Sequence, residues 1–290
     1  MPTQRREMAG KICLVTGATS GIGKATALTL AREGATLIGV GRDPGRCTES
    51  AAEIVRQSGN GSVRFWRADL SRQAEVRALA RQIRENYPRL DLLINNAGGR
   101  FVRRTTTADG LEMTFALNHL ACFQLTMLLF ECLERAGEAR VVSVSSGAHR
   151  ACPGIDFDDL NGEGGYDGRM AYAQSKLANL LFIYELARRL RGSGITANAA
   201  APGNVVTRFS LNNGWISWLS HLAGSLKSGS LVGPARGAAT VLYLSCAPEL
   251  RGESGGYYAD GKKQGSSPAS YDLEAAARLW RVSGELTKTG

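Results

Sequence analysis

The stretch Lys11-Ile-Cys-Leu-Val-Thr16-Gly17-Ala-Thr-Ser-Gly21-Ile-Gly23 decides the fold. Residues 11–16 are a short apolar run typical of a buried strand, and residues 22–33 have a helical pattern that stops at Gly34. Glycines between a strand and a helix let the backbone turn tightly and approach a phosphate, while the helix N-terminus supplies free N–H groups. The order strand, glycine-rich turn, helix therefore predicts a phosphate site, although its spacing differs from the common GxGxxG.

Strand and helix patterns alternate along the rest of the chain, which predicts an α/β fold. We expect strands at 36–41, 63–67, 90–94, 140–144, 195–200 and 255–259, and helices at 45–57, 71–86, 111–133, 172–186, 234–246 and within 268–284. Such alternation is typical of one doubly wound, Rossmann-type parallel sheet with helices on both faces. We expect a single domain over residues 1–290, with a flexible N-terminus (1–8), an insertion loop over the site (151–169) and a lid (208–232) that is alternatively a core helix.

Two predicted strands end in charged residues, at the place where open α/β sheets bind ligands. Arg42 follows the second strand. In dinucleotide-binding folds an acid at this point holds a ribose 2′-hydroxyl, whereas an Arg accepts a 2′-phosphate. Because Asp43 comes one residue later, NADP(H) is favoured over NAD(H), with a solvent-facing Arg42 as the alternative. Asp69, followed by Leu70, ends the third strand and could accept from an adenine amino group or cap the next helix.

Small and polar residues close two further strands. The stretch Asn95-Asn96-Ala97-Gly98 follows the fourth strand, where a flat adenosine and ribose could lie. Ser145 and Ser146 follow the fifth strand, and either side chain could point at the site. Asn118 lies within a predicted helix, where Asn is unfavourable unless its side chain has a role such as holding a water or a Lys.

Tyr172 and Lys176 lie four residues apart in a predicted helix, so the ammonium can lie beside the phenol. A free phenol titrates near ~10. A positive charge about 5 Å away, at an effective dielectric of about 20, is worth roughly 3 kcal/mol, or a fall of about two pKa units. The pair therefore predicts a general acid/base, with a half-buried Tyr beside an exposed Lys as the alternative.

The composition is that of an ordinary soluble globular protein, with 43 % hydrophobic and 21 % charged residues. The net charge of +9 comes from scattered basic pairs without interleaved aromatics, which argues against nucleic acid. The six cysteines form no CxxC pair and no metal-ligand spacing, which suits a reducing cytoplasm. No apolar run reaches the roughly 18 residues of a membrane span. We expect a cytoplasmic protein.

Together these motifs make the chain resemble the short-chain dehydrogenase/reductase family over residues 9–282. The resemblance rests on Thr16-Gly17-x3-Gly21-Ile22-Gly23, Asn95-Asn96-Ala97-Gly98, Asn118, Ser146, Tyr172-x3-Lys176 and Pro202-Gly203-x3-Thr207. Within the family the chain looks most like the retinol dehydrogenase branch. That likeness rests on Asn118-His119-Leu120, on Val144-Ser145-Ser146-Gly-Ala-His149 and on the Ala171-Tyr-Ala-Gln-Ser-Lys-Leu-Ala-Asn-Leu180 stretch.

The resemblance implies a role for each matching residue. Tyr172 would exchange a proton with the substrate oxygen, and Ser146 would hydrogen-bond that oxygen. Lys176 would lower the Tyr172 pKa and bind the nicotinamide ribose, and Asn118 would anchor a water-linked proton relay. The implied cofactor-binding set is Gly17, Thr19, Ser20, Gly21, Ile22, Gly23, Arg42, Asp69, Leu70, Asn95, Asn96, Ala97, Gly98, Tyr172, Lys176, Pro202, Gly203, Val205 and Thr207.

The expected activity is hydride transfer between NADP(H) and the carbonyl or alcohol carbon of a mostly apolar, retinal-like or other lipophilic substrate. Two alternatives stay open. One is a cofactor-binding sensor or scaffold without turnover, and the other is reduction of a ring double bond, as in the related protochlorophyllide reductases. Many family members pair the helices that hold Asn118 and Tyr172, so the resemblance also leaves a homodimer open.

Overall fold

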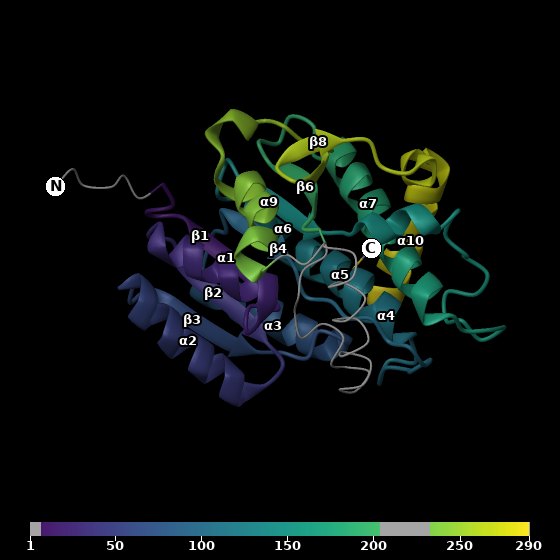
Figure 1. Cartoon of the computed structure of the whole chain (residues 1–290), viewed down its shortest axis with the longest axis horizontal. Coiled ribbons are helices and arrows are strands. Elements are labelled where there is room, and N and C mark those ends of the chain that lie inside the picture. The colour runs from purple at the N-terminus through teal and green to yellow at the C-terminus, as the bar shows by residue number, and fades with distance from the viewer. Residues whose placement is uncertain (1–6, 204–232, 290) are drawn as a thin grey trace.

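An eight-stranded sheet forms the centre of the molecule (Figure 1). The structure, a computed structural model, describes residues 7–203 and 233–289. The strands are β1 (Ile12–Thr16), β2 (Thr36–Gly41), β3 (Val63–Arg67), β4 (Leu92–Asn95), β5 (Arg140–Val144), β6 (Thr196–Ala201), β7 (Tyr257–Ala259) and β8 (Lys262–Gln264). Their order is β3-β2-β1-β4-β5-β6-β7-β8, with every pair parallel except β7 and β8.

Helices cover both faces of this sheet. They are α1 (Gly21–Arg32), α2 (Pro44–Ser58), α3 (Gln73–Asn86), α4 (Met113–Phe115), α5 (Ala121–Leu128), α6 (Phe130–Glu134), α7 (Gly168–Arg189), α9 (Pro234–Cys246) and α10 (Leu273–Thr287). Short turns of other helix types are η1 (Ala116–Leu120), η2 (Gly147–Ala151), η4 (Pro248–Leu250) and η5 (Pro268–Tyr271). No helix in the described ranges is long and apolar enough to cross a membrane.

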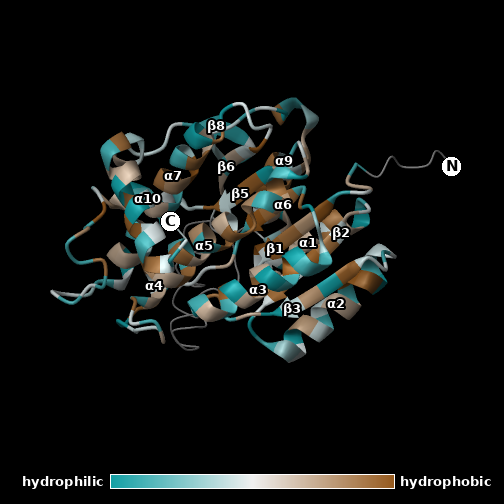
Figure 2. Cartoon of the chain, turned by 180° about the vertical axis from the view of Figure 1, so that it is seen from behind, coloured by the Kyte–Doolittle hydropathy of each residue, from teal (hydrophilic) through white to brown (hydrophobic). Residues whose placement is uncertain are grey.

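Two apolar cores lie between the sheet and its helices, one on each face. Successive residues of β1 point to opposite faces, so Val15 packs into one core and Leu14 into the other. The Val15 core is closed by α1, α2 and α9, and the Leu14 core by α3, α5 and α7. Figure 2 shows apolar strands between helices whose outer surfaces are hydrophilic. The predicted doubly wound fold is confirmed.

The strand order reverses between β1 and β4. The chain builds outward from β1 to β3 and then crosses back to place β4 on the other side of β1. In open α/β sheets, ligands bind outside the carboxyl ends of the strands at such a switch point. The topology therefore brings the ends of β1, β2, β4 and β5 to one edge of the sheet.

Two elements differ from the sequence prediction. The helix predicted over 111–133 is divided into α4, the π-helical turn η1, α5 and α6. In addition, β8 follows β7 through a two-residue turn in which Asp260 and Gly261 both have positive φ, +50° and +71°. This geometry is that of a tight hairpin turn, and a three-residue polar strand leaves no hydrophobic pattern to find it by. The predicted lid, 208–232, lies outside the described residues.

Candidate active site

A cleft of about 870 Å³ lies at this edge of the sheet and extends from the glycine-rich turn to α7. Among the predicted cofactor-binding residues, it is lined by Gly17, Thr19, Ser20, Gly21, Ile22, Gly23, Arg42, Asp69, Leu70, Asn96, Ala97, Gly98, Tyr172, Lys176, Pro202 and Gly203. Val205 and Thr207 lie outside the described residues. Segments far apart in the sequence therefore share one cavity.

The glycine-rich turn is packed so closely that it excludes side chains. Gly17 has a φ of +66°, a left-handed conformation that glycine adopts without strain. A Cβ on Gly23 would lie 2.3 Å from the Gly17 oxygen and 2.4 Å from Asn96 Nδ2. Asn96 Nδ2 in turn donates to the Thr16 carbonyl at 2.7 Å, which ties the end of β4 to the end of β1. The backbone of the turn and the start of α1 therefore face the cleft.

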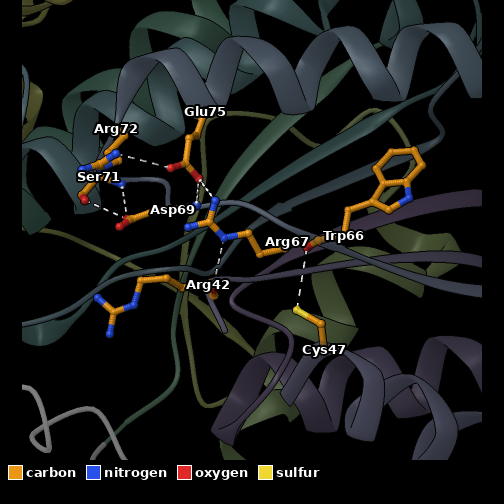
Figure 3. A network of polar contacts seen from close by, with 8 residues as sticks. All are labelled: Arg42, Cys47, Trp66, Arg67, Asp69, Ser71, Arg72 and Glu75. Carbon is orange, nitrogen blue, oxygen red and sulfur yellow. Dashed lines mark hydrogen bonds and ion pairs between the residues drawn. The ribbon is translucent and has the colours of Figure 1, made fainter. Parts of the chain in front are cut away.

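Arg42 and the neighbouring acid, Asp43, both line the cleft. Asp43 is the N-cap of α2, and its Oδ1 accepts a hydrogen bond from the Arg46 N–H at 2.8 Å. In Figure 3 the Arg42 guanidinium points away from the polar network around Glu75. Arg42 is joined to the residues drawn there through its backbone carbonyl. The donor to this carbonyl is Arg67 Nε at 3.3 Å.

Asp69 is held at the end of β3 by a local turn (Figure 3). Its Oδ1 accepts from the Ser71 N–H at 3.1 Å and from the Ser71 hydroxyl at 2.7 Å. The N-cap of α3 is Arg72, so Asp69 does not cap that helix as the alternative prediction had it. Glu75 fixes the same corner from α3, since it accepts from the Asp69 N–H at 2.7 Å and pairs with Arg67 at 2.8 Å.

The Asn95 side chain does not face the cleft, contrary to the prediction. It is 5 % exposed and donates to Thr126 Oγ1 on α5 at 3.0 Å. Successive residues of an extended strand point to opposite faces. Asn96, one residue later, lines the cleft instead.

Asn118 lies behind the cleft in the π-helical turn η1 and holds neighbouring backbone with its side-chain amide. Its Oδ1 accepts from the Gly99 N–H at 2.8 Å, and its Nδ2 donates to the Gly99 carbonyl at 2.9 Å. The same Nδ2 also lies 2.9 Å from Ser175 Oγ. The side chain therefore joins the segment after β4 to α7, rather than holding Lys176 directly. Single π turns are rare within helices and are frequent at functional sites.

The structure separates the two serines that follow β5. Ser145 is 2 % exposed, and its hydroxyl donates to the Lys176 carbonyl at 3.1 Å. Ser146 lines the cleft together with Tyr172, and its side chain acts to lower the pKa of the Tyr172 phenol. The Ser146 hydroxyl is therefore the one presented to the Tyr172 phenol.

Lys176 does not lower the Tyr172 pKa in the way predicted from their spacing. Its Nζ lies 5.6 Å from the centre of the Tyr172 ring but donates to the Val144 carbonyl at 2.9 Å. Burial raises the pKa of Tyr172 to about 12, with the hydrogen bond to Ser146 and the charge of Arg100 acting against that rise. Burial also lowers the pKa of Lys176 to about 8. The spacing of the two residues gives the effect of the ammonium charge but not the effect of losing water around both groups.

The sequence profile of the short chain dehydrogenase family matches residues 11–214. The chain belongs to this family. It is 41 % identical to human Retinol dehydrogenase 13 over 287 residues, covering 96 % of this chain and 84 % of that protein. It is also 40 % identical over 276 residues to DnrU of Streptomyces sp. (strain C5), named as a candidate daunorubicin C-13 ketoreductase, covering 94 % and 91 % of the two chains.

The fold comparison agrees with the family assignment. A short chain dehydrogenase from Shigella flexneri, solved in complex with NADP, superposes with a TM-score of 0.70 at 25 % identity, covering 89 % of this chain and all of that one. The predicted resemblance to the retinol dehydrogenase branch is confirmed. Short chain dehydrogenases are oxidoreductases that use nicotinamide cofactors on alcohol and carbonyl groups.

The sequence did not predict two features of the cleft in this short chain dehydrogenase. Arg100 lines the cleft directly after Gly99, and its charge lowers the pKa of Tyr172. Its position right after the strand-ending motif could have indicated it. The insertion loop 151–169 contributes its ends, Ala151 and Arg169, to the described lining. Within the loop, Tyr166 bonds Glu112 at 3.0 Å, so this part packs against the segment before α4 rather than over the cleft.

Proposed function

We propose that this short chain dehydrogenase transfers hydride between NADP(H) and the carbonyl or alcohol carbon of a lipophilic aldehyde or ketone. The observation that carries the proposal is the pairing of Tyr172 with Ser146 in the same cleft as the glycine-rich turn. A proton donor and a hydrogen-bonding hydroxyl beside a phosphate-binding turn are what such a transfer requires.

The described residues fit a nicotinamide dinucleotide. The turn at Gly17 and Gly23 is packed too closely to carry side chains, so its backbone can approach a phosphate, and the start of α1 presents N–H groups beside it. The cleft runs from there to Tyr172 and Lys176, so one extended ligand can contact both ends. When bound, the cofactor supplies or accepts the hydride.

Arg42 supports NADP(H) over NAD(H). Arg42 lines the cleft at the end of β2, where a 2′-phosphate would need a cation. The carboxylate that would instead hold a 2′-hydroxyl belongs to Asp43, and one of its oxygens is used by the N-terminus of α2. The Shigella flexneri relative complexed with NADP is consistent with this choice.

Tyr172 would handle the proton. Burial raises the pKa of Tyr172 to about 12, so the phenol is protonated at neutral pH. It can therefore donate its proton to the oxygen of a carbonyl group whose carbon receives the hydride. Ser146 would hydrogen-bond the same oxygen. In the direction of alcohol oxidation, the phenolate is the base, and both the Ser146 hydroxyl and the Arg100 charge favour it.

The lining also supports a substrate with an apolar body. Met113, Leu117 and Ala151 line the cleft together with Tyr257. The names of two relatives, a retinol dehydrogenase and a candidate ketoreductase of daunorubicin, are consistent with a lipophilic substrate.

The test is the oxidation of NADPH, and separately of NADH, with a panel of lipophilic aldehydes and ketones that includes retinal. We expect turnover with NADPH that is lost in Tyr172→Phe. Arg42→Ser should weaken NADPH more than NADH, whereas Arg81→Ser, an exposed arginine on α3, should change neither. Cofactor binding without turnover of any panel member would favour the sensor or scaffold, and a preference for NADH would overturn the assignment of Arg42.

A further inference from the structure

We propose that His149 is a positioning residue, which fixes the backbone of Ser146 to the Ser266–Tyr271 segment and so to helix α7. The proposal rests on the proposed function, because it concerns how Ser146 and Tyr172 are held together. His149 lies in η2, three residues after Ser146, and is completely buried.

The contacts of the imidazole define which nitrogen carries the proton. Nε2 lies 3.1 Å from the Ser267 backbone nitrogen, which can only donate, so Nε2 accepts. A neutral imidazole then carries its proton on Nδ1, which lies 2.7 Å from the Ser146 carbonyl oxygen and donates to it. The imidazole thus bridges a carbonyl on one side and an N–H on the other.

The bridge fixes the residue that pairs with Tyr172. The Ser146 carbonyl also accepts from the His149 N–H at 3.2 Å, and the Ser146 hydroxyl accepts from the Ala148 N–H at 3.2 Å. With its carbonyl held by two hydrogen bonds from His149, the backbone of Ser146 has little freedom to rotate. Its hydroxyl is therefore kept toward Tyr172.

The far side of the bridge is anchored on the helix that carries Tyr172. Ser266, next to Ser267, shares a hydrogen bond of 2.8 Å with the Tyr184 hydroxyl on α7. Tyr271 stacks on Tyr184 with ring centres 5.4 Å apart and an interplanar angle of 10°. The contacts form a closed ring that leaves α7 at Tyr172, passes through Ser146, His149 and Ser267, and returns to α7 at Tyr184.

This closed series of contacts requires a neutral imidazole at His149. A protonated His149 would turn Nε2 into a donor facing the Ser267 N–H, and that bond would be lost. Among the described residues, the charge of Arg150 on η2 acts on His149, and the ring centre of Tyr257 on β7 lies 5.2 Å away. Burial and the charge of Arg150 both lower the pKa of His149, which keeps the ring neutral at neutral pH.

Three variants separate positioning from simple stability. His149→Phe keeps a ring but removes both bonds. Ser267→Pro removes the backbone N–H at a native φ of −71° that suits proline, and it also removes the Ser267 hydroxyl, which is buried and has no hydrogen-bond partner among the described residues. The matched control is Ser283→Ala, which removes the hydroxyl 2.9 Å from another buried histidine, His119, away from Ser146.

We expect kcat for the best panel substrate to fall about ten- to a hundred-fold in His149→Phe and Ser267→Pro, because small displacements of reacting groups cost that much. The Kd for NADPH should stay within about two-fold of wild type, and Ser283→Ala should keep its kcat. In the wild type, kcat should fall at low pH as His149 becomes protonated. This fall should be absent from the pH profile of His149→Phe. A kcat unchanged in both variants, or lowered equally by Ser283→Ala, would overturn the proposal.

A second measurement does not depend on turnover. The chain has three histidines, so nitrogen-15 NMR with His149→Phe as reference assigns the His149 signals. We expect a neutral ring protonated on Nδ1 in the wild type and a changed tautomer or shift in Ser267→Pro. Protonation on Nε2 would refute the bridge. If the wild type turns over no substrate, the proposed function fails, and the NMR result alone decides the role of His149.

Discussion

Replacing Asn118 by leucine tests whether its amide holds the segment after β4 against α7. Asn118 is 1 % exposed, and the change keeps a side chain of similar size. The buried Gly99 would lose the partners of its N–H and its carbonyl, which now lie 2.8 and 2.9 Å from the amide. An unsatisfied buried group costs about 1–3 kcal/mol, so two cost about 2–6 kcal/mol. Ser175 adds little, because its hydroxyl still donates to the Tyr172 carbonyl at 2.8 Å.

The assay is the free energy of unfolding in urea, followed by circular dichroism, for wild type, Asn118→Leu and Asn95→Leu. Asn95 is a matched control, since it is also buried but makes one side-chain bond, to Thr126, which keeps its own bond to the Cys122 carbonyl. Loss of one such bond costs about 0.5–1.5 kcal/mol. A loss in Asn118→Leu no larger than in Asn95→Leu would refute the reasoning. Faster hydrogen exchange at the Gly99 amide should accompany the predicted loss.

Three further predictions concern the cleft. Gly23→Ala should abolish NADPH binding in a fluorescence titration, because its Cβ would lie 2.3 Å from a backbone oxygen of the same turn, whereas Gly61→Ala, with open space around it, should bind normally. Arg100→Gln should move the rising limb of the pH profile for alcohol oxidation to higher pH, since the pKa of Tyr172 rises when the nearby charge is removed; an unmoved limb would contradict this. Lys176 has a folded pKa of about 8 against about 10.4 unfolded, so between these values the unfolded chain holds one more proton and stability rises with pH. In urea titrations, the free energy of unfolding of the wild type should therefore rise relative to that of Lys176→Met by up to about 1.4 kcal/mol per pH unit over this range. A difference between the two proteins that does not change with pH would contradict the effect of burial.

The parts that the sequence predicted correctly are those with local patterns. The alternation of strands and helices gave the doubly wound sheet, and the helix bounds 234–246 agree with α9 (Pro234–Cys246) because Gly233 and Pro234 mark its start. The placement of Arg42 and Ser146 in one cleft also follows from strand order, since strand ends meet at one edge of a parallel sheet.

The parts that it did not predict depend on contacts between distant segments. Spacing placed Lys176 beside Tyr172 but could not show that the Val144 carbonyl, 32 residues away, takes the ammonium. The 111–133 helix is divided at η1, where Asn118 bonds Gly99, and helix periodicity carries no information on that contact. In the same way, the bond between His149 and Ser267 joins residues 118 positions apart.

The two edges of the sheet bear on how these molecules meet one another. Edge strands expose unpaired backbone groups that can recruit a second chain, and charged side chains there prevent it. At one edge β3 presents the exposed Arg64, and at the other β8 presents the exposed Lys262. Any two edges brought together would therefore set positive charge against positive charge. The hairpin that adds β8 thus protects the sheet from growing into a continuous, aggregated sheet across molecules, and leaves the helical faces as the surfaces through which copies could associate.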